Sequence, residues 1–172
     1  MRRRLLGAAL VVGACIMLSG CVVPRLIWPQ SDIKASELNT SAGEKNVLVA
    51  SRTSAFKDAV VARIGDAFRD EPVHVKFIGL DDLDKEDAAK YDALVLIDTC
   101  IAWGLDRKVD AFLGRNKAAH NIIVLTTSGD GKWVPKKDGR NFDAIATASQ
   151  QASVDKIAGS IIDKIKTLLN QT

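Results

Sequence analysis

The sequence has few of the residues from which catalytic and metal sites are usually built. It contains two histidines, His74 and His120, which lie far apart and have no partners at metal-ligand spacing. It has no nucleophile–base pair, no catalytic carboxylates at a fixed spacing, no Walker motif and no GxGxxG dinucleotide motif. We therefore expect no metal, and a non-catalytic protein is favoured over an enzyme.

An excess of one charge is also missing. The chain has 24 Lys and Arg against 21 Asp and Glu. Three of the basic residues, Arg2 to Arg4, lie at the N-terminus, and the other 21 balance the 21 acidic residues. No basic run and no patch of basic and aromatic residues remains, so nucleic acid is not an expected partner.

The N-terminal residues have the pattern of a secretory signal. Arg2 to Arg4 precede an apolar run at 5–17, which is short for a bilayer span, and Leu18-Ser-Gly-Cys21 follows. This ending resembles the lipobox of bacterial lipoproteins, which implies cleavage after residue 20 and a lipid on the Cys21 sulfur. The alternative is an uncleaved N-terminal anchor helix.

The lipobox resemblance also implies a location. A palmitate-bearing lipoprotein is held on a membrane of the cell envelope through its acyl chains. Val22 stands where such lipoproteins carry aspartate for inner-membrane retention, which favours the periplasmic face of the outer membrane. Once Cys15 has left with the signal peptide and Cys21 is lipidated, Cys100 is alone, so we expect no intramolecular disulfide.

The rest of the chain divides into a linker and a domain. Residues 22–44 lack a sustained apolar pattern and contain Pro24, Pro29 and a run of Ser, Asn, Thr and Gly. We interpret 1–20 as the signal peptide, 21–44 as the lipidated N-terminus with a flexible tether, and 45–172 as one domain.

The domain alternates between strand and helix patterns. Short apolar or alternating runs predict five strands, at 47–50, 73–78, 93–97, 121–125 and 142–147. Amphipathic patterns predict helices at 56–68, 107–115 and 154–168. This alternation predicts an α/β fold, a three-layer α-β-α sandwich with a five-stranded parallel sheet.

Three stretches resemble motifs of the flavodoxin family. Ser51-Arg-Thr-Ser-Ala-Phe-Lys57, after the first strand, is similar to the family's SRTGNTK phosphate loop. Tyr91–Ile97 is similar to its third strand, and Ile101-Ala-Trp-Gly104 and Ala111-Phe-Leu113 are similar to the loop and helix that follow. The resemblance implies strand order 2-1-3-4-5, with ligands at the carboxyl ends of the strands.

The first of these loops departs from the family's chemistry. Ser54, Ala55 and Phe56 replace the glycine, asparagine and threonine. Glycine allows consecutive backbone N–H groups to point at a phosphate, so its loss weakens such a cradle. Three hydroxyls and the partial positive charge of the helix N-terminus remain. We expect Phe56 to pack against the sheet, because it falls in line with the apolar stripe of the helix.

The resemblance implies a set of residues that would surround FMN if it bound. They lie in the loops after the first, third and fourth strands: Ser51, Arg52, Thr53, Ser54, Thr99, Trp103, Thr126, Thr127, Ser128 and Trp133. Trp103 and Trp133 could stack on a flavin or cover the end of the sheet. Cys100 is interpreted as a small apolar residue at a strand end.

These observations favour an envelope lipoprotein whose flavodoxin-like domain has a decayed flavin site. Its role would be non-catalytic binding or scaffolding, with the membrane and an envelope protein as partners and no cofactor. The alternative is a membrane-tethered electron carrier that binds FMN.

Overall fold

The structure, a computed structural model, describes residues 30–40 and 45–171. The expected signal peptide, Cys21 and most of the expected tether lie outside these residues. Residues from Ser31 onward form one compact unit. In the part of the chain that is described, no helix is both long enough and apolar enough to cross a membrane.

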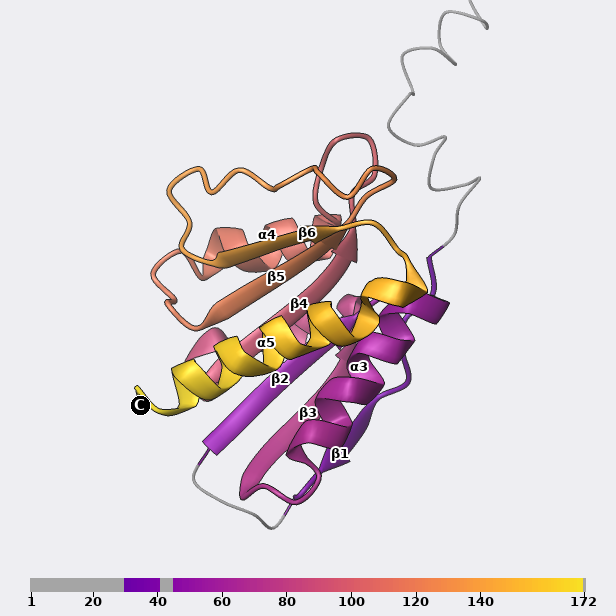
Figure 1. The fold of residues 1–172 in the computed structure, drawn as a ribbon. Helices are drawn as coiled ribbons and strands as arrows, with labels where there is room; N and C mark the ends of the chain where they lie inside the picture. The colour runs from indigo at the N-terminus through magenta and orange to yellow at the C-terminus, as the bar shows by residue number, and fades with distance from the viewer. Residues whose placement is uncertain (1–29, 41–44, 172) are drawn as a thin grey trace, which may run out of the picture. The chain divides into compact units, whose positions relative to one another are not determined.

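The compact unit is built on one six-stranded sheet, in the order β1-β3-β2-β4-β5-β6 (Figure 1). The strands are β1 (Ser36–Leu38), β2 (Lys45–Ser51), β3 (Val73–Gly79), β4 (Ala93–Thr99), β5 (Ile122–Thr127) and β6 (Asp143–Thr147). The five strands β2 to β6 are parallel to their neighbours, and with β2 counted as the first strand their order is the predicted 2-1-3-4-5. β1 pairs antiparallel with β3. The predicted parallel sheet is thus confirmed, with one additional edge strand.

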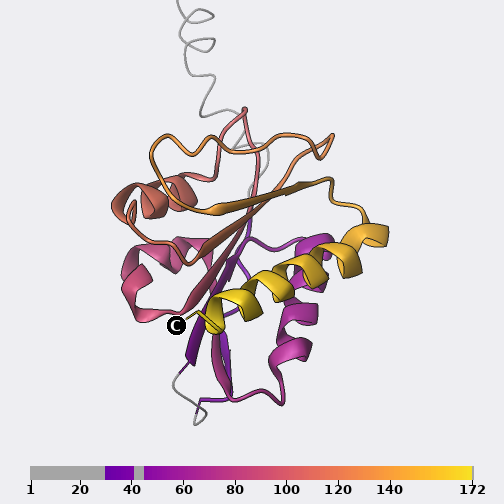
Figure 2. The same cartoon turned by 60° about the vertical axis from the view of Figure 1, so that its left-hand side comes forward.

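Helices cover both faces of the sheet. α3 (Ala55–Phe68) and α5 (Val154–Leu169) lie on one face, and α4 (Arg107–Arg115) lies on the other with the 3₁₀ segments Leu80–Lys85 and Ala88–Lys90 (Figure 2). The β5–β6 connection contains no helix, as its glycine, lysine and aspartate content predicts. Arg140 holds this loop: it bonds to Asp110 at 2.6 Å and to the carbonyl oxygens of Lys136 and Lys137.

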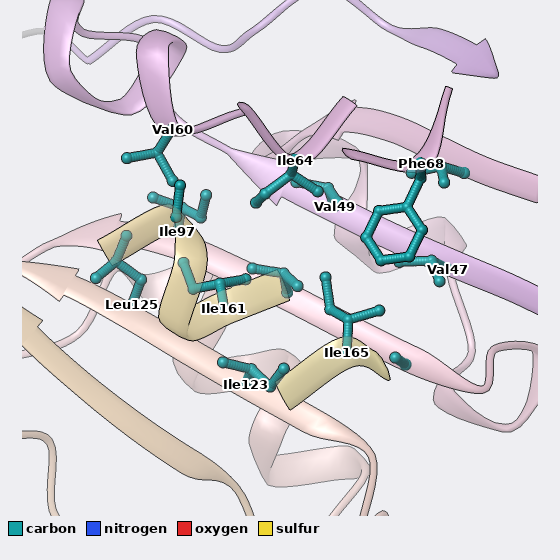
Figure 3. Packing of buried hydrophobic residues seen from close by; sticks show 14 of the residues in the cluster. Val47, Val49, Val60, Ile64, Phe68, Ile97, Ile123, Leu125, Ile161 and Ile165 are labelled. Carbon is teal, nitrogen blue, oxygen red and sulfur yellow. The ribbon is translucent and has the colours of Figure 1, made fainter. Parts of the chain in front are cut away.

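Two apolar cores lie on either side of the sheet, because successive side chains of a strand point to opposite faces. Val47 and Val49 face α3 and α5, and Figure 3 shows Ile64, Phe68, Ile161 and Ile165 around them. Leu48 and Ala50 face α4 and the 3₁₀ segments. The apolar runs that predict fully buried strands are therefore those that fill both cores.

The predicted boundary between tether and domain is wrong where the structure describes it. Residues 31–40 belong to the compact unit, because Ser36–Leu38 form β1 and Leu38 packs against the core of α3 and α5. Asn39 donates from its side chain to the carbonyl oxygens of Phe68, Glu71 and Val73 at 2.8–3.1 Å. The polar composition of this segment concealed its pairing, because β1 is short and mostly exposed.

Candidate functional site

The expected site residues lie along the edge of the sheet at which β2, β4 and β5 end, called here the carboxyl edge. Ser51 closes β2, Thr99 closes β4, and Thr126 and Thr127 close β5. Parallel strands bring these ends side by side: Thr99 pairs in register with Thr127. The structure therefore brings together the residues after three separate strands, as the flavodoxin resemblance implies.

Arg52 is the centre of this edge. Its side chain is 8% exposed, and its guanidinium contacts three carboxylates: Asp32 at 2.6 Å, Asp81 at 3.1 Å and Asp106 at 3.1 Å. Burial alone would lower the pKa of Arg52, but the hydrogen bonds to Asp81 and Asp106 raise it above its usual value. Arg52 is consequently a buried cation whose charge is fully matched by the chain itself.

Asp32 ties the segment before β1 to this arginine. Its carboxylate also accepts hydrogen bonds from the backbone N–H groups of Leu80 at 3.1 Å and Asp81 at 3.0 Å. The Asp32 side chain lies so close to Gly79 that a Cβ there would overlap it. The Asp32 carboxylate thus already fills an anion position made by Arg52 and two backbone donors.

The segment around Asp32 also accepts a hydrogen bond from the loop that was expected to bind phosphate. The backbone N–H of Thr53 donates to the carbonyl oxygen of Ser31 at 2.7 Å, and that of Ile33 donates to the carbonyl oxygen of Ser51 at 3.4 Å. We call residues Ser31–Ile33 the strap. Because the strap lies across the turn after β2, Thr53 has no free backbone donor for an anion.

The hydroxyls of the loop are committed as well. Ser54 is the N-cap of α3, and its hydroxyl accepts from the backbone N–H of Lys57 at 3.3 Å. Thr53 donates to the carboxylate of Asp58, and Ser51 donates to the carbonyl oxygen of Arg52. Ser54 therefore acts as an ordinary helix cap. Phe56 is 2% exposed and packs in the core, as its place in the apolar stripe predicts.

Two charged residues that sequence reasoning missed complete the cluster. Lys57 is 2% exposed, and its ammonium group donates to the hydroxyl of Thr99. Asp98 is fully buried and accepts the backbone N–H of Asp106 at 2.9 Å. The one signal in the sequence was position: Asp98 directly follows the apolar run of β4, and Lys57 is next to the core residue Phe56.

Burial shifts the pKa values of this pair toward each other. Desolvation lowers the pKa of Lys57 to about 8, although the nearby carboxylate of Asp98 opposes the change. Desolvation likewise raises the pKa of Asp98 to about 6, against the hydrogen bond from Asp106 and the charge of Lys57. Oδ1 of Asp98 and the hydroxyl of Thr126 are buried and make no hydrogen bond of ordinary geometry. Thr126 is nevertheless near enough to Asp98 to lower the pKa of its carboxyl group.

The loop after β4 holds Trp103 out in solvent. Ile101 and Gly104 exchange two backbone hydrogen bonds of 3.2 Å, which closes a tight turn. Its central residues, Ala102 and Trp103, have φ of 52° and 60°, the left-handed values of a type I′ turn. Trp103 is 82% exposed, so it does not cover the end of the sheet as one expectation had it.

The last expected residues, Ser128 and Trp133, lie in the loop after β5, and Cys100 directly follows β4. Ser128 bonds to Asp130, and Trp133 is half-buried in the loop before β6. Cys100 is a half-buried thiol whose pKa is raised by desolvation, which disfavours the reactive thiolate. Among the described residues, no group of three or more His, Cys, Asp or Glu is placed to hold a metal.

The phosphate of FMN does not fit this arrangement. Around the turn after β2 lie two cations, Arg52 and Lys57, and five carboxylates, from Asp32, Asp58, Asp81, Asp98 and Asp106. A dianion placed there would face excess negative charge, and the guanidinium that should attract it is already paired. Two hollows of about 300 and 310 Å³ lie elsewhere, one between β1 and α3 and one beside His120 and Lys164.

Comparison with known proteins bears on the fold alone. Neither a protein-family model nor a curated protein sequence matches the chain. Among solved structures, it is similar to a flavodoxin from the domain Archaea, with a TM-score of 0.50 and 15% identity over 72% of this chain and 98% of that one.

Two further similar structures belong to larger proteins. The Flv1 flavodiiron core from Synechocystis sp. PCC6803 gives a TM-score of 0.56 at 12% identity over 78% of this chain, and the flavodiiron protein from Giardia intestinalis gives 0.50 at 11% over 75%. The chain spans 38% and 37% of those two proteins. The strand order and these similarities together show that the chain has a flavodoxin-like fold.

Proposed function

We propose that this chain is an envelope lipoprotein whose flavodoxin-like domain is a non-catalytic binding or scaffolding module with a decayed flavin site. A lipid on Cys21 would hold it on the membrane, with the periplasmic face of the outer membrane favoured. Its partner would be an envelope protein, and it would need no cofactor.

The observation that carries this proposal is the pairing of Arg52. A phosphate site requires donors and a cation that are not already paired. Here three carboxylates pair with the guanidinium of Arg52. The N–H of Thr53 donates to the strap. Buried ion pairs of this kind stabilise the fold only when every partner is in place. The polar groups of the carboxyl edge therefore bind one another, which supports a non-catalytic role for the fold.

The alternative, a membrane-tethered electron carrier that binds FMN, has one observation in its favour. Trp103 offers an exposed flat ring on a turn whose backbone is held in an unfavourable conformation. Strained backbone of this kind is concentrated at sites of function. In the flavodoxin resemblance this loop lies against the isoalloxazine, although the phosphate end does not fit.

Two measurements on the chain extracted from membranes test the proposal. Mass spectrometry of the N-terminal peptide should find a lipid on Cys21, and the Cys21→Ser variant should leave the membrane fraction. The visible spectrum of the purified protein should lack the absorbance of oxidised flavin. A yellow protein that releases FMN on heating would instead support the electron carrier.

A further inference from the structure

Trp103 is the most exposed large apolar side chain in the described part of the chain. It is 82% exposed, and it lies on the loop after β4 in the turn that Ile101 and Gly104 close. Tryptophan is among the residues that most often anchor protein interfaces, because its ring combines a large apolar surface with a face that attracts cations. An exposed ring at the carboxyl edge is therefore a candidate contact for a partner.

The backbone of the turn holds this ring out at a cost. Ala102 and Trp103 are both left-handed, and such backbone costs roughly 1–2 kcal/mol at a residue with a side chain. The cation–π contacts among the described residues all use phenylalanine rings, so no cation of this part of the chain lies over the ring of Trp103. The turn thus presents an aromatic face that the domain itself does not use.

Carboxylates lie beside this turn. The N–H of Cys100 donates to the carbonyl oxygen of Thr127 at 2.8 Å, so the loops after β4 and β5 begin side by side and project from the same end of the domain (Figures 1 and 2). Desolvation raises the pKa of the Cys100 thiol, and backbone N–H groups of the turn that carries Trp103 lower it. The charges of Asp98 and Asp130 raise the same pKa further, which places both carboxylates within electrostatic reach of the turn.

Asp130 is held in place and keeps its charge. Its carboxylate accepts the hydroxyl of Ser128 at 3.2 Å and the backbone N–H of Lys132 at 3.0 Å, and the second of these bonds is the main cause that lowers the pKa of Asp130. Gly131 fits this loop against Ala148, where a Cβ would lie 2.4 Å from the backbone nitrogen. Among the described residues, no ammonium or guanidinium group lies within 4.0 Å of the Asp130 carboxylate. Asp130 is consequently a fixed, exposed anion.

Carboxylates also outnumber cations along the whole carboxyl edge. Asp130 is a sixth carboxylate beside the five around the turn after β2. The cations of this edge are the two buried ones and the exposed Arg107 and Lys132, which leaves two carboxylates in excess. Neighbouring charges form balanced pairs: Lys85 with Asp82 and Lys108 with Asp84. An edge of this charge repels an anionic surface and favours a cationic partner.

We propose that the carboxyl edge binds a basic segment of a protein partner, with one arginine or lysine over the ring of Trp103 and another at Asp130. Arginine suits both positions, because its planar guanidinium stacks on an aromatic face and also pairs with a carboxylate. The inference rests on the proposed binding role and gives the chemistry of the partner that this role requires. It does not depend on the lipid at Cys21.

Fluorescein-labelled hexa-arginine tests this surface on the full lipidated chain in a neutral detergent, with fluorescence anisotropy as the measurement and labelled hexa-glutamate as the control peptide. Trp103→Ala and Asp130→Asn change the two proposed contacts. Val134→Ala is the matched control for an exposed apolar side chain, and Asp163→Asn is the matched control for an exposed carboxylate, on α5.

We expect saturable binding of hexa-arginine by the parent and none of hexa-glutamate. Trp103→Ala should weaken the affinity roughly 2- to 30-fold, the size of one cation–π contact. Asp130→Asn should weaken it as well, and both control variants should bind as the parent does. An absence of binding by the parent, or equal affinities for all five proteins, would overturn the proposal, because the attraction would then not involve Trp103.

Two other occupants of the ring are separate outcomes. If the Cys21→Ser chain pellets with phosphatidylcholine vesicles and Trp103→Ala abolishes this, the ring meets lipid and the proposal is overturned. Self-association that Trp103→Ala abolishes would assign the ring to a second copy of the chain, with the same consequence. A yellow preparation would overturn the proposed function, whereas a colourless chain that does not bind hexa-arginine overturns this inference alone.

Discussion

Asp32 lies 2.6 Å from the guanidinium of Arg52, 20 residues further along the chain. The pair joins the strap to the turn after β2, where the flavodoxin resemblance had implied a phosphate. Asp32 meets Arg52 from the N-terminal side, and Asp81 and Asp106 meet it from the segments after β3 and β4. One buried cation thus holds together four parts of the sequence.

Loss of the charge at Asp32 should weaken the fold more than loss of the charge at Asp81. Asp32→Asn gives up charge-assisted bonds to Arg52 and two backbone donors, a loss of about 1–3 kcal/mol in the free energy of unfolding. Asp81→Asn is the matched control, because the Asp81 side chain is 65% exposed, and should cost at most about 1 kcal/mol. Urea denaturation measures both. Equal losses would mean that the strap contributes little.

Gly79 should be required by the position of Asp32. An alanine Cβ there would overlap the Asp32 side chain, so Gly79→Ala should displace the strap and lower the melting temperature. Gly159→Ala, in the middle of α5, has open space around its Cβ and should raise stability by about 0.5–1 kcal/mol. A Gly79→Ala variant as stable as the parent, or more stable, would contradict the close approach of Asp32 and Gly79.

The Lys57–Asp98 pair should give the domain a distinct dependence on pH. The folded pKa of Asp98, about 6, lies above its unfolded value of about 3.9, so stability should fall as pH rises between those values. The folded pKa of Lys57, about 8, lies below its unfolded value of about 10.4, so stability should rise between about pH 8 and 10.4. Between pH 6 and 8 both groups are charged and the full desolvation cost applies.

Lys57→Met separates the two contributions. The rise in stability above pH 8 should disappear, and the acidic fall should extend to higher pH because Asp98 loses its nearby positive charge. Denaturant unfolding across a pH series measures both effects. An alkaline rise that survives in Lys57→Met would assign it to another group.

Ala102→Gly should relieve the turn that carries Trp103. Glycine adopts positive φ without strain, so the variant should gain about 0.5–1 kcal/mol after the loss of unfolded-state entropy is subtracted. Ala62→Gly, at an exposed position in α3, should instead lose about 1 kcal/mol. Thermal unfolding distinguishes the two signs. Destabilisation by Ala102→Gly would show that the turn is not strained.

The sequence predicted the features that depend on local pattern. The apolar runs of β2, β4 and β5 predict strands buried on both faces, and the phosphate-loop likeness indicates where the edge of the sheet would carry polar residues. The partners of Arg52 could not be predicted from the sequence, because Asp32, Asp81 and Asp106 are distant from one another along the chain and come together only after the sheet forms. β1 could not be predicted, because three residues, two of them exposed, carry too little periodicity.

Titration with FMN shows whether the carboxyl edge takes flavin. The Cys21→Ser chain, free of lipid, is titrated while the fluorescence of FMN is followed. We predict no saturable quenching, because Arg52 and the N–H of Thr53 have no capacity left for a phosphate. Saturable quenching at one FMN per chain would show that the edge binds flavin and would identify the protein as a flavin carrier.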